Sequence, residues 1–325
     1  MNKDSTPFPD NVLLNENWET EEEVRDRIKR RLQPYTLGDF LALEIKPREM
    51  LLAPILPEKG LAMMYASRGT GKTLVANGIG YAVATGTRFL KWTAPKPRQV
   101  LLIDGEMPAA TLQERFNNIV ANGSDTAALQ IISGDLIEEG GIGNLASRGL
   151  QDELEPWLVG VDLLILDNLS SLTAVIRDND AESWEPIQDW LLRLRRRGVS
   201  VLIIHHAGKG GQQRGTSRRE DVLDTVINLR HPDDYSPTEG ARIEIHYEKA
   251  RGVYGDDAKP FEAKLQVING AAVWTMRELE EVDLERVRAL LAVGLSVREI
   301  AEETAIPKSV IGRLKQKIEA ERGAP

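Results

Sequence analysis

The segment Ala66-Ser67-Arg68-Gly69-Thr70-Gly71-Lys72-Thr73 decides the fold of this chain. It follows Gly60-Leu61-Ala62-Met63-Met64-Tyr65, a run typical of a short buried strand. Residues 72–83 then have the apolar periodicity of a helix, with small residues on the packing side. A strand, a glycine-rich loop and a helix in this order form a phosphate-binding loop, because backbone N–H groups at the helix start cradle phosphate oxygens.

Each residue type in this loop predicts a contact with ATP and Mg²⁺. We expect Lys72 to reach the β- and γ-phosphates and the Thr73 hydroxyl to hold Mg²⁺. The nucleotide-binding residues are expected to be Ser67, Arg68, Gly69, Thr70, Gly71, Lys72 and Thr73. Ala66 replaces the first glycine of the motif, and because alanine avoids positive φ, we expect an altered start of the loop. The alternative is a glycine-rich turn that binds no nucleotide.

Composition limits the class of protein. The chain has 325 residues, of which 42% are hydrophobic and 28% charged, as in a soluble globular protein with room for one large core and a smaller module. Its net charge of −9 argues against a general polyanion-binding surface but allows a local basic channel. With no cysteine, it has no disulfides or thiolate metal sites. We expect a cytoplasmic protein without a membrane span.

Strands and helices alternate from Leu61 to His205, which predicts an α/β fold with a parallel sheet. Strands are expected at 99–104, 129–133, 163–166 and 200–205, and helices at 110–121, 149–159 and 184–197. Past Asp221, strands at 224–229, 241–247, 261–267 and 272–276 are expected to extend the sheet in antiparallel fashion. Asn269-Gly270 predicts a hairpin between the last two.

The ends of the chain differ from this core. Residues 1–17 resemble a tail, and residues 19–33 predict a highly charged helix that is either a solvated surface helix or an arm linking subunits. We therefore divide the chain into a tail and linker helix (1–45), an ATPase domain (46–277) and a C-terminal domain (278–325).

The C-terminal domain predicts a helix-turn-helix. Helices are expected at 282–292, from 296 to about 303, and at 308–322, with a capping box from Ser296 to Glu299. Its small core is expected to contain Ile300, Ala301, Ile306, Val310 and Leu314, and Ala305 replaces the usual turn glycine. If it binds DNA, the residues facing the major groove are Lys308, Ser309, Gly312, Arg313 and Lys315. Such modules also mediate protein contacts.

Acidic residues end two of the predicted parallel strands. Asp167 follows the apolar run 163–166, and the carboxyl ends of parallel strands meet where a phosphate loop lies, so we expect Asp167 to hold Mg²⁺ opposite Thr73. Hydrolysis also needs a carboxylate to polarise the attacking water. Glu106 is the preferred candidate, and Asp104 is the competing one.

The Asp104-Gly105-Glu106-Met107 context resembles that of RecA-type ATPases, and more narrowly that of hexameric replicative helicases of the RepA and DnaB type. The resemblance covers roughly residues 45–276 and implies a RecA-like core. In that family the residue matching Glu106 is the catalytic base. Either His205 or His206 would be a γ-phosphate sensor, although a histidine pair here also suits a hydrogen-bonded turn.

Glu248-Lys249-Ala250-Arg251-Gly252 resembles the Lys-x-Arg finger of DnaB-like helicases. The resemblance implies that Lys249 and Arg251 enter the neighbouring subunit's site, where their charge assists catalysis. The alternative is a solvated basic loop.

Nucleic acid is expected at the segment 207–220, which is glycine-rich and basic. In RecA-like motors this loop faces a central pore, so the resemblance implies phosphate contacts to single-stranded DNA. The residues concerned are Lys209, Arg214, Arg218 and Arg219, with Arg177 from the preceding loop. Arg214 could alternatively sense phosphate.

Together these features predict a ring-forming, Mg²⁺-dependent ATPase. We expect a homo-oligomer, a hexamer by resemblance, that acts as a DNA helicase translocating on single-stranded DNA. Two alternatives remain: an ATP-switched DNA-binding regulator that uses the helix-turn-helix without unwinding, and a ring-forming scaffold that loads another enzyme.

Overall fold

The computed structural model describes residues 34–121, 123, 125–126, 128–138, 141–173, 181–208, 221–304 and 306–322. The chain divides into two compact units, residues 1–47 and 48–325, which are considered separately. The predicted tail and the helix 19–33 lie outside the described residues. In the first unit, α2 (Leu37–Leu41) is capped by Thr36, whose side chain accepts the backbone N–H of Asp39 over 3.2 Å.

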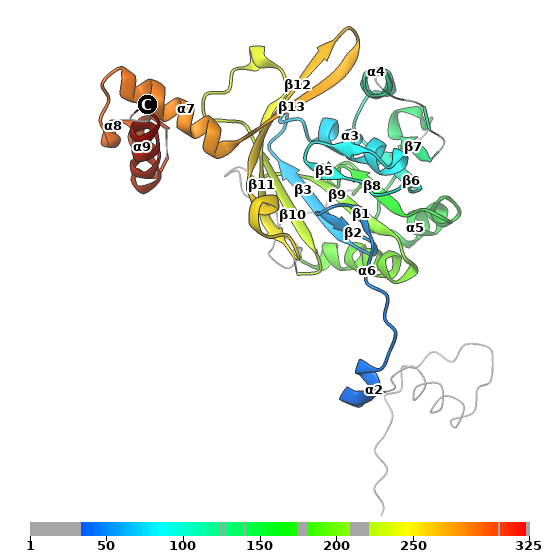
Figure 1. Cartoon of the computed structure of the whole chain (residues 1–325). Helices are drawn as coiled ribbons and strands as arrows, with labels where there is room; N and C mark the ends of the chain where they lie inside the picture. Colours follow the sequence, from blue (N-terminus) through cyan, green and yellow to red (C-terminus); the bar gives the residue numbers. More distant parts are fainter. Residues whose placement is uncertain are drawn as a thin grey trace, which may run out of the picture. The chain divides into compact units, whose positions relative to one another are not determined.

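A nine-stranded sheet forms the centre of the second unit, in the order β13-β12-β11-β10-β3-β9-β8-β6-β7 (Figure 1). Its strands are β3 (Leu61–Ala66), β6 (Val100–Asp104), β7 (Leu129–Ser133), β8 (Leu163–Asp167), β9 (Ser200–His206), β10 (Thr225–Arg230), β11 (Arg242–Ala250), β12 (Phe261–Ile268) and β13 (Ala271–Glu278). The strands from β10 to β7 in this order are parallel, and β11 to β13 are antiparallel. This agrees with a mostly parallel, RecA-like core.

The expected direction of β10 is wrong. The sequence pattern groups it with the antiparallel extension, but β10 pairs in parallel with β3, with Thr225 opposite Ala62. The chain leaves β9 at its carboxyl end and returns to the amino end of β3 before β10 begins, where the Asp224 carboxylate accepts the N–H of Leu61 over 3.0 Å. A strand that starts at that edge must run with β3.

Apolar layers cover both faces of the sheet. Alternate residues of β3 belong to different clusters: Met64 packs with α3 (Lys72–Thr85), and Met63 packs with α6 (Ala181–Arg197). Strands buried on both faces read as continuous apolar runs, as β8 does. Gly78 of α3 allows close packing, because a Cβ there would lie 2.2 Å from the Phe89 ring. Phe116 of α4 (Ala109–Val120) packs against the cluster that contains α3, whereas Leu150 and Leu154 of α5 (Arg148–Leu154) belong to the cluster that contains α6.

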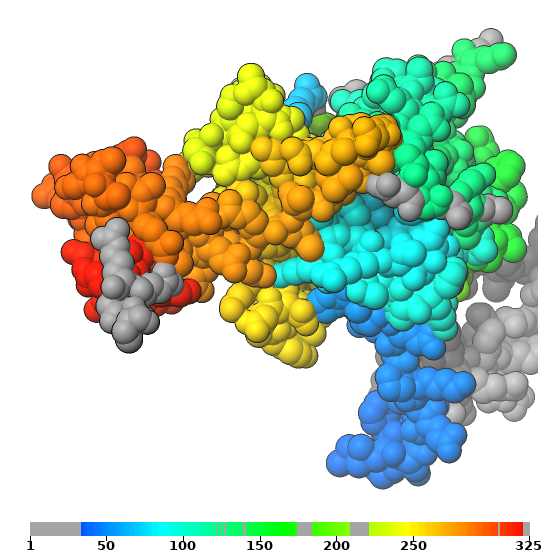
Figure 2. Space-filling model, turned by 45° about the horizontal axis from the view of Figure 1, so that its top comes forward, coloured from blue at the N-terminus to red at the C-terminus, as the bar shows by residue number. Residues whose placement is uncertain are grey.

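Short elements complete the core. They are β1 (Met50–Leu52), β2 (Leu56–Pro57), β4 (Arg88–Phe89), β5 (Trp92–Thr93) and the 3₁₀ turns η1 (Gly134–Leu136), η2 (Glu155–Leu158), η4 (Pro237–Glu239) and η5 (Gly255–Ala258). The helix expected over 149–159 is α5 followed by η2, and Pro156 stands in the first turn of η2. The predicted hairpin is confirmed, since Asn269 and Gly270 have φ of 52° and 79°. Its strand β13 also contacts α4, which Figure 2 shows in teal beside the orange hairpin.

The C-terminal residues form α7 (Leu279–Ala292), α8 (Val297–Thr304) and α9 (Lys308–Arg322). The predicted capping box is confirmed: the Glu299 N–H donates to Ser296 Oγ over 3.3 Å, and the Ser296 N–H donates to Glu299 Oε2 over 2.8 Å. The helices share a core of Val287, Ile300, Ile306, Ile311, Leu314 and Ile318. Ala301 and Val310 are only partly buried there, and Ala305 lies outside the described residues. In the described part of the chain, no helix has the length and apolarity to cross a membrane.

Candidate nucleotide site

The loop between β3 and α3 has the backbone that a phosphate loop needs. Gly69 and Gly71 have φ of 79° and 106°, a backbone conformation that is unfavourable for residues with a Cβ. Ala66, which replaces the first glycine of the motif, is the last residue of β3 and does not have positive φ, so alanine fits this position without backbone strain. Its methyl group is fully buried in the sheet.

Lys72 is the central cation of this loop. Its ammonium donates to the carbonyl oxygens of Ala66 over 3.2 Å and Ser67 over 2.8 Å. Burial lowers the pKa of Lys72, and the nearby carboxylates of Asp167 and Glu106 oppose that shift. The Thr70 hydroxyl also donates to the Ser67 carbonyl over 3.0 Å, so this carbonyl accepts a second hydrogen bond from within the loop. The buried Lys72 ammonium is thus bound by carbonyl oxygens of its own loop.

Two aspartates end adjacent strands beside this loop. Asp104 on β6 and Asp167 on β8 are direct partners in the sheet register. Burial raises the pKa of Asp167 to about 7, while its hydrogen bond with the Thr73 side chain opposes the shift. The Oδ2 atoms of both aspartates are buried and have no hydrogen-bond partner among the described residues. Buried carboxylate oxygens without a partner are the ligands that a divalent cation would satisfy.

Glu106 projects from the turn that follows Asp104. The Oδ1 atom of Asp104 accepts the backbone N–H groups of Glu106 over 3.0 Å and Met107 over 2.7 Å, and Asp104 is only 1% exposed. The Glu106 side chain is 53% exposed and accepts a hydrogen bond from the Asn168 amide. Its Oε2 also lies 3.4 Å from Nε2 of His206. Asp104 therefore shapes the turn, while Glu106 presents its carboxylate.

These groups line one cleft of about 420 Å³. The predicted residues on its wall are Arg68, Gly69, Gly71, Lys72, Thr73, Glu106, Asp167 and His206. The described wall also contains Asp104, Asn168, Arg115 and Tyr235, and the last three were not predicted. Among the described residues, no group of three or more acidic, histidine or cysteine side chains is placed to hold a metal ion.

A family model described as an AAA domain matches residues 11–212, which is more than half of the chain. The chain belongs to the AAA domain family. No curated protein matches it. One similar solved structure is the flagellar accessory protein FlaH from Methanocaldococcus jannaschii, with 11% identity and a TM-score of 0.45 over 68% of this chain and 91% of that chain.

Family membership makes this AAA domain a P-loop ATPase. The match includes the phosphate loop, Glu106, Asp167 and His206, and it ends before β10.

Arg115 of this AAA domain reaches the cleft from α4. Burial lowers the pKa of its guanidinium, and the charges of Asp167 and Asp104 oppose the shift. A sequence signal was present, because Arg115 stands three positions after Leu112, the buried residue of α4. Residues three apart share a helix face, so a cation at this position faces inward.

The histidine pair is divided between the two faces of β9. His206 lines the cleft beside Glu106, whereas His205 is buried outside its described wall. Burial and Lys72 lower the pKa of His206, and Glu106 opposes them. Of the two predicted sensor candidates, His206 is the one placed against the cleft.

Lys249 and Arg251 lie away from the cleft in their own chain. Lys249 pairs with Val226 near the start of β10, and the Arg251 N–H donates to the Asp224 carbonyl over 2.9 Å. This is the amino end of β3, whereas the phosphate loop follows its carboxyl end, roughly 15–20 Å along the strand. Neither side chain can reach the phosphate loop of its own chain.

The residues predicted to bind nucleic acid are divided. Arg177, Lys209, Arg214, Arg218 and Arg219 lie outside the described residues. On α9, Lys308 and Arg313 are exposed, and Lys315 lies 3.8 Å from Glu319.

Proposed function

We propose that this AAA domain is a Mg²⁺-dependent ATPase that works as a ring-shaped DNA helicase. The convergence of Lys72, Thr73, Glu106 and Asp167 on one cleft carries the ATPase part. The Lys72 ammonium moves from the two loop carbonyls to the β- and γ-phosphates, a charge-assisted exchange of acceptors. Thr73 and Asp167 would hold Mg²⁺, which would neutralise charge on the phosphates.

Glu106 is proposed as the group that activates water. Its carboxylate accepts a proton as the water oxygen bonds to the γ-phosphorus, and the bond from that phosphorus to the bridging oxygen breaks to release ADP and phosphate. Asn168 and His206 orient the carboxylate through the contacts described above. His206 thus connects the reacting group to the end of β9.

Placement of the finger residues supports an oligomeric site. Lys249 and Arg251 cannot serve their own phosphate loop, so we propose that they complete the cleft of the neighbouring subunit. A head-to-tail contact of this kind, repeated around an axis, closes a ring. A hexamer is the subunit number that the RepA and DnaB resemblance implies.

The DNA-binding part rests on the basic, glycine-rich sequence of segment 207–220. It begins directly after His206, where the Ala207 N–H donates to the Ala66 carbonyl over 2.8 Å, so it leaves the sheet beside the phosphate loop. We propose that the basic residues of this segment hold phosphates of single-stranded DNA in the ring.

Strand displacement tests this proposal. We expect the wild-type protein to separate a forked duplex with ATP and Mg²⁺, and Lys72→Ala to abolish both separation and ATP hydrolysis. Lys96→Ala, which removes a half-exposed surface cation, is the control and should retain both. ATP hydrolysis without strand separation would contradict the helicase part and leave the ATPase part standing.

The structure also favours a second candidate, an ATP-switched DNA-binding regulator. Helices α7 to α9 have their own apolar core, and α9 exposes Lys308 and Arg313. A regulator would bind one duplex sequence tightly, lose that binding in Lys308→Ala/Arg313→Ala, and unwind nothing. Unchanged duplex binding in this variant would contradict the second candidate.

A further inference from the structure

The cleft extends beyond the phosphate loop to the connection between β10 and β11. Tyr235, Gly240 and Ala241 of this connection line the cleft together with Leu74. A Cβ built at Gly71 would lie 3.9 Å from the Cβ of Ala241, so the connection packs directly beside the phosphate loop. This part of the wall presents an aromatic ring and apolar side chains instead of charges.

The Tyr235 ring is held on two sides. It stacks on His231 with ring centroids 3.7 Å apart and an interplanar angle of 11°. Its hydroxyl donates to the Gly240 carbonyl over 2.9 Å. His231 is itself fixed, because its Nδ1 lies 3.0 Å from the Arg242 carbonyl. The ring is therefore positioned before any ligand arrives.

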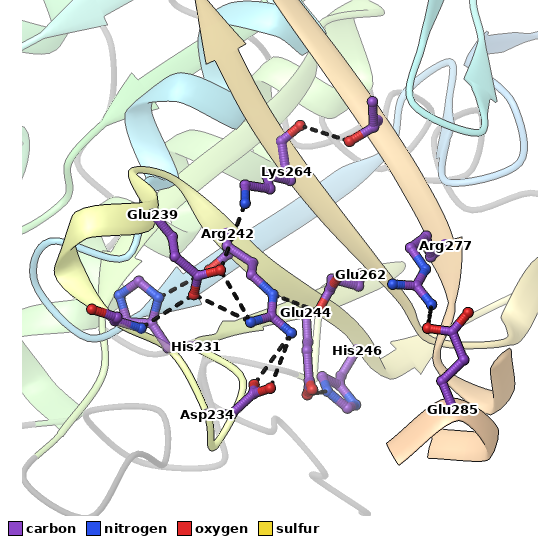
Figure 3. Close-up of polar contacts among 12 residues, drawn as sticks. His231, Asp234, Glu239, Arg242, Glu244, His246, Glu262, Lys264, Arg277 and Glu285 are labelled. Atoms are coloured by element: carbon purple, nitrogen blue, oxygen red, sulfur yellow. Dashed lines mark hydrogen bonds and ion pairs between the residues drawn. The ribbon is translucent and has the colours of Figure 1, made fainter. Parts of the chain in front are cut away.

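Arg242 fastens the whole connection to the sheet. Its guanidinium contacts Glu262 over 2.8 Å, Glu239 over 3.2 Å and Asp234 over 3.2 Å, and its side chain is only 13% exposed. Figure 3 shows these carboxylates arranged around the guanidinium. Glu239 also lies 3.6 Å from Lys264 of β12. Asp234 and Glu239 belong to the connection, so one cation holds both ends of the Tyr235 turn.

We infer that Tyr235 is a platform for the nucleobase of the bound triphosphate, and that Arg242 is its positioning residue. The inference rests on the proposed function, because the phosphates must occupy the loop from Gly69 to Thr73. Stacking on an aromatic ring tolerates every base, since each has a π-face. The apolar neighbours Leu74 and Ala241 have no side-chain donor or acceptor to read a base edge. The site is therefore expected to accept different nucleoside triphosphates, with little discrimination between ATP and GTP.

Calorimetric titration with ATP, GTP and inorganic tripolyphosphate, each with Mg²⁺, tests the platform. Tyr235→Ala should weaken ATP and GTP binding roughly ten-fold and leave tripolyphosphate binding unchanged. Tyr235→Phe keeps the ring and should stay within about two-fold of wild type. Tyr254→Ala removes a tyrosine that is 78% exposed and outside the described wall of the cleft, and it should change nothing.

The positioning role has its own readout. Asp234→Asn and Glu239→Gln loosen the connection without removing the guanidinium, and they should weaken ATP but not tripolyphosphate binding. Equal weakening of both ligands, or no change in Tyr235→Ala, would overturn the inference. If the wild-type protein binds tripolyphosphate as tightly as ATP, the platform fails and the phosphate site stands. If it binds neither ligand, the proposed function fails.

Discussion

The backbone N–H of Arg251 donates to the carbonyl of Asp224 over 2.9 Å. The Asp224 carboxylate in turn accepts a hydrogen bond from the N–H of Leu61 at the amino end of β3. Arg251 is thereby fixed at the edge of the sheet opposite the phosphate loop. This places Arg251 away from the phosphate loop of its own chain, as the proposed sharing of sites between subunits requires.

Mixing two inactive variants tests shared sites. Arg251→Ala and Lys72→Ala should each lower ATP hydrolysis by on the order of 10³-fold, because each removes a cation from the reacting phosphates. Mixed assemblies contain interfaces with an intact Lys72 opposite an intact Arg251, and they should regain part of the activity. Arg298→Ala, on the exposed side of α8, is the control. Arg251→Ala with full activity would contradict a finger acting between subunits.

The raised pKa of Asp167 predicts a pH-dependent stability. Below pH 4 this carboxyl is protonated in both the folded and the unfolded chain. Between pH 4 and 7 only the unfolded chain ionises, so the stability that the protonated form contributes is lost as pH rises through about 7. In chelator-treated protein, Asp167→Asn should therefore gain stability over wild type between pH 4.5 and pH 8, by at most about 4 kcal/mol.

Urea denaturation at the two pH values measures this gain. The control is Asp162→Asn, which changes a half-buried aspartate directly before β8. A constant difference between Asp167→Asn and wild type would mean that the buried carboxyl has an ordinary pKa.

Arg115 should contribute to hydrolysis. Its guanidinium lines the cleft near Asp104 and Asp167, where it offsets negative charge from the triphosphate. We expect Arg115→Ala to lower kcat about ten-fold or more and Arg115→Lys to recover part of the loss. Gln113→Ala, an exposed position on the same helix, is the matched control. Steady-state ATPase rates equal to those of wild type would exclude this role.

A substitution in the apolar core of helices α7 to α9 should destabilise these helices without affecting the nucleotide cleft. Ile311 is fully buried in their core, and Ile311→Ala should cost about 2–5 kcal/mol there. Limited proteolysis should then release the C-terminal helices while ATP hydrolysis persists. Val293→Ala, at an exposed position after α7, is the control. A simultaneous loss of ATPase activity would show that these helices support the catalytic core.

Much of the core could be predicted from the sequence, because its strands are apolar runs that end in functional residues. The strand expected to end before Asp167 and the helix expected to start at Lys72 occur in the structure within a residue or two of their predicted bounds. The direction of β10 could not be predicted, since a parallel and an antiparallel partner require the same apolar residues. Direction depends on the edge where the strand begins, which only the fold determines.

The cleft residues that the sequence did not predict were missed for a similar reason, because their position depends on the fold. Tyr235 lies in a polar connection without periodicity, and its place in the cleft depends on the ion pairs of Arg242 with residues on other elements. The sequence favours Glu106 over Asp104 as the water-activating carboxylate, which stays a prediction, and the structure adds a physical argument for it. Asp104 uses one oxygen to cap the turn, which leaves Glu106 facing the cleft.

Glu106→Gln tests the central claim most directly, because it removes the proton acceptor and preserves the shape of the side chain. We predict that this variant binds ATP with Mg²⁺ within about three-fold of wild type and hydrolyses it at least about 100-fold more slowly in single-turnover measurements. Hydrolysis at the wild-type rate by Glu106→Gln would contradict the assignment of this cleft as an ATPase centre built on Glu106.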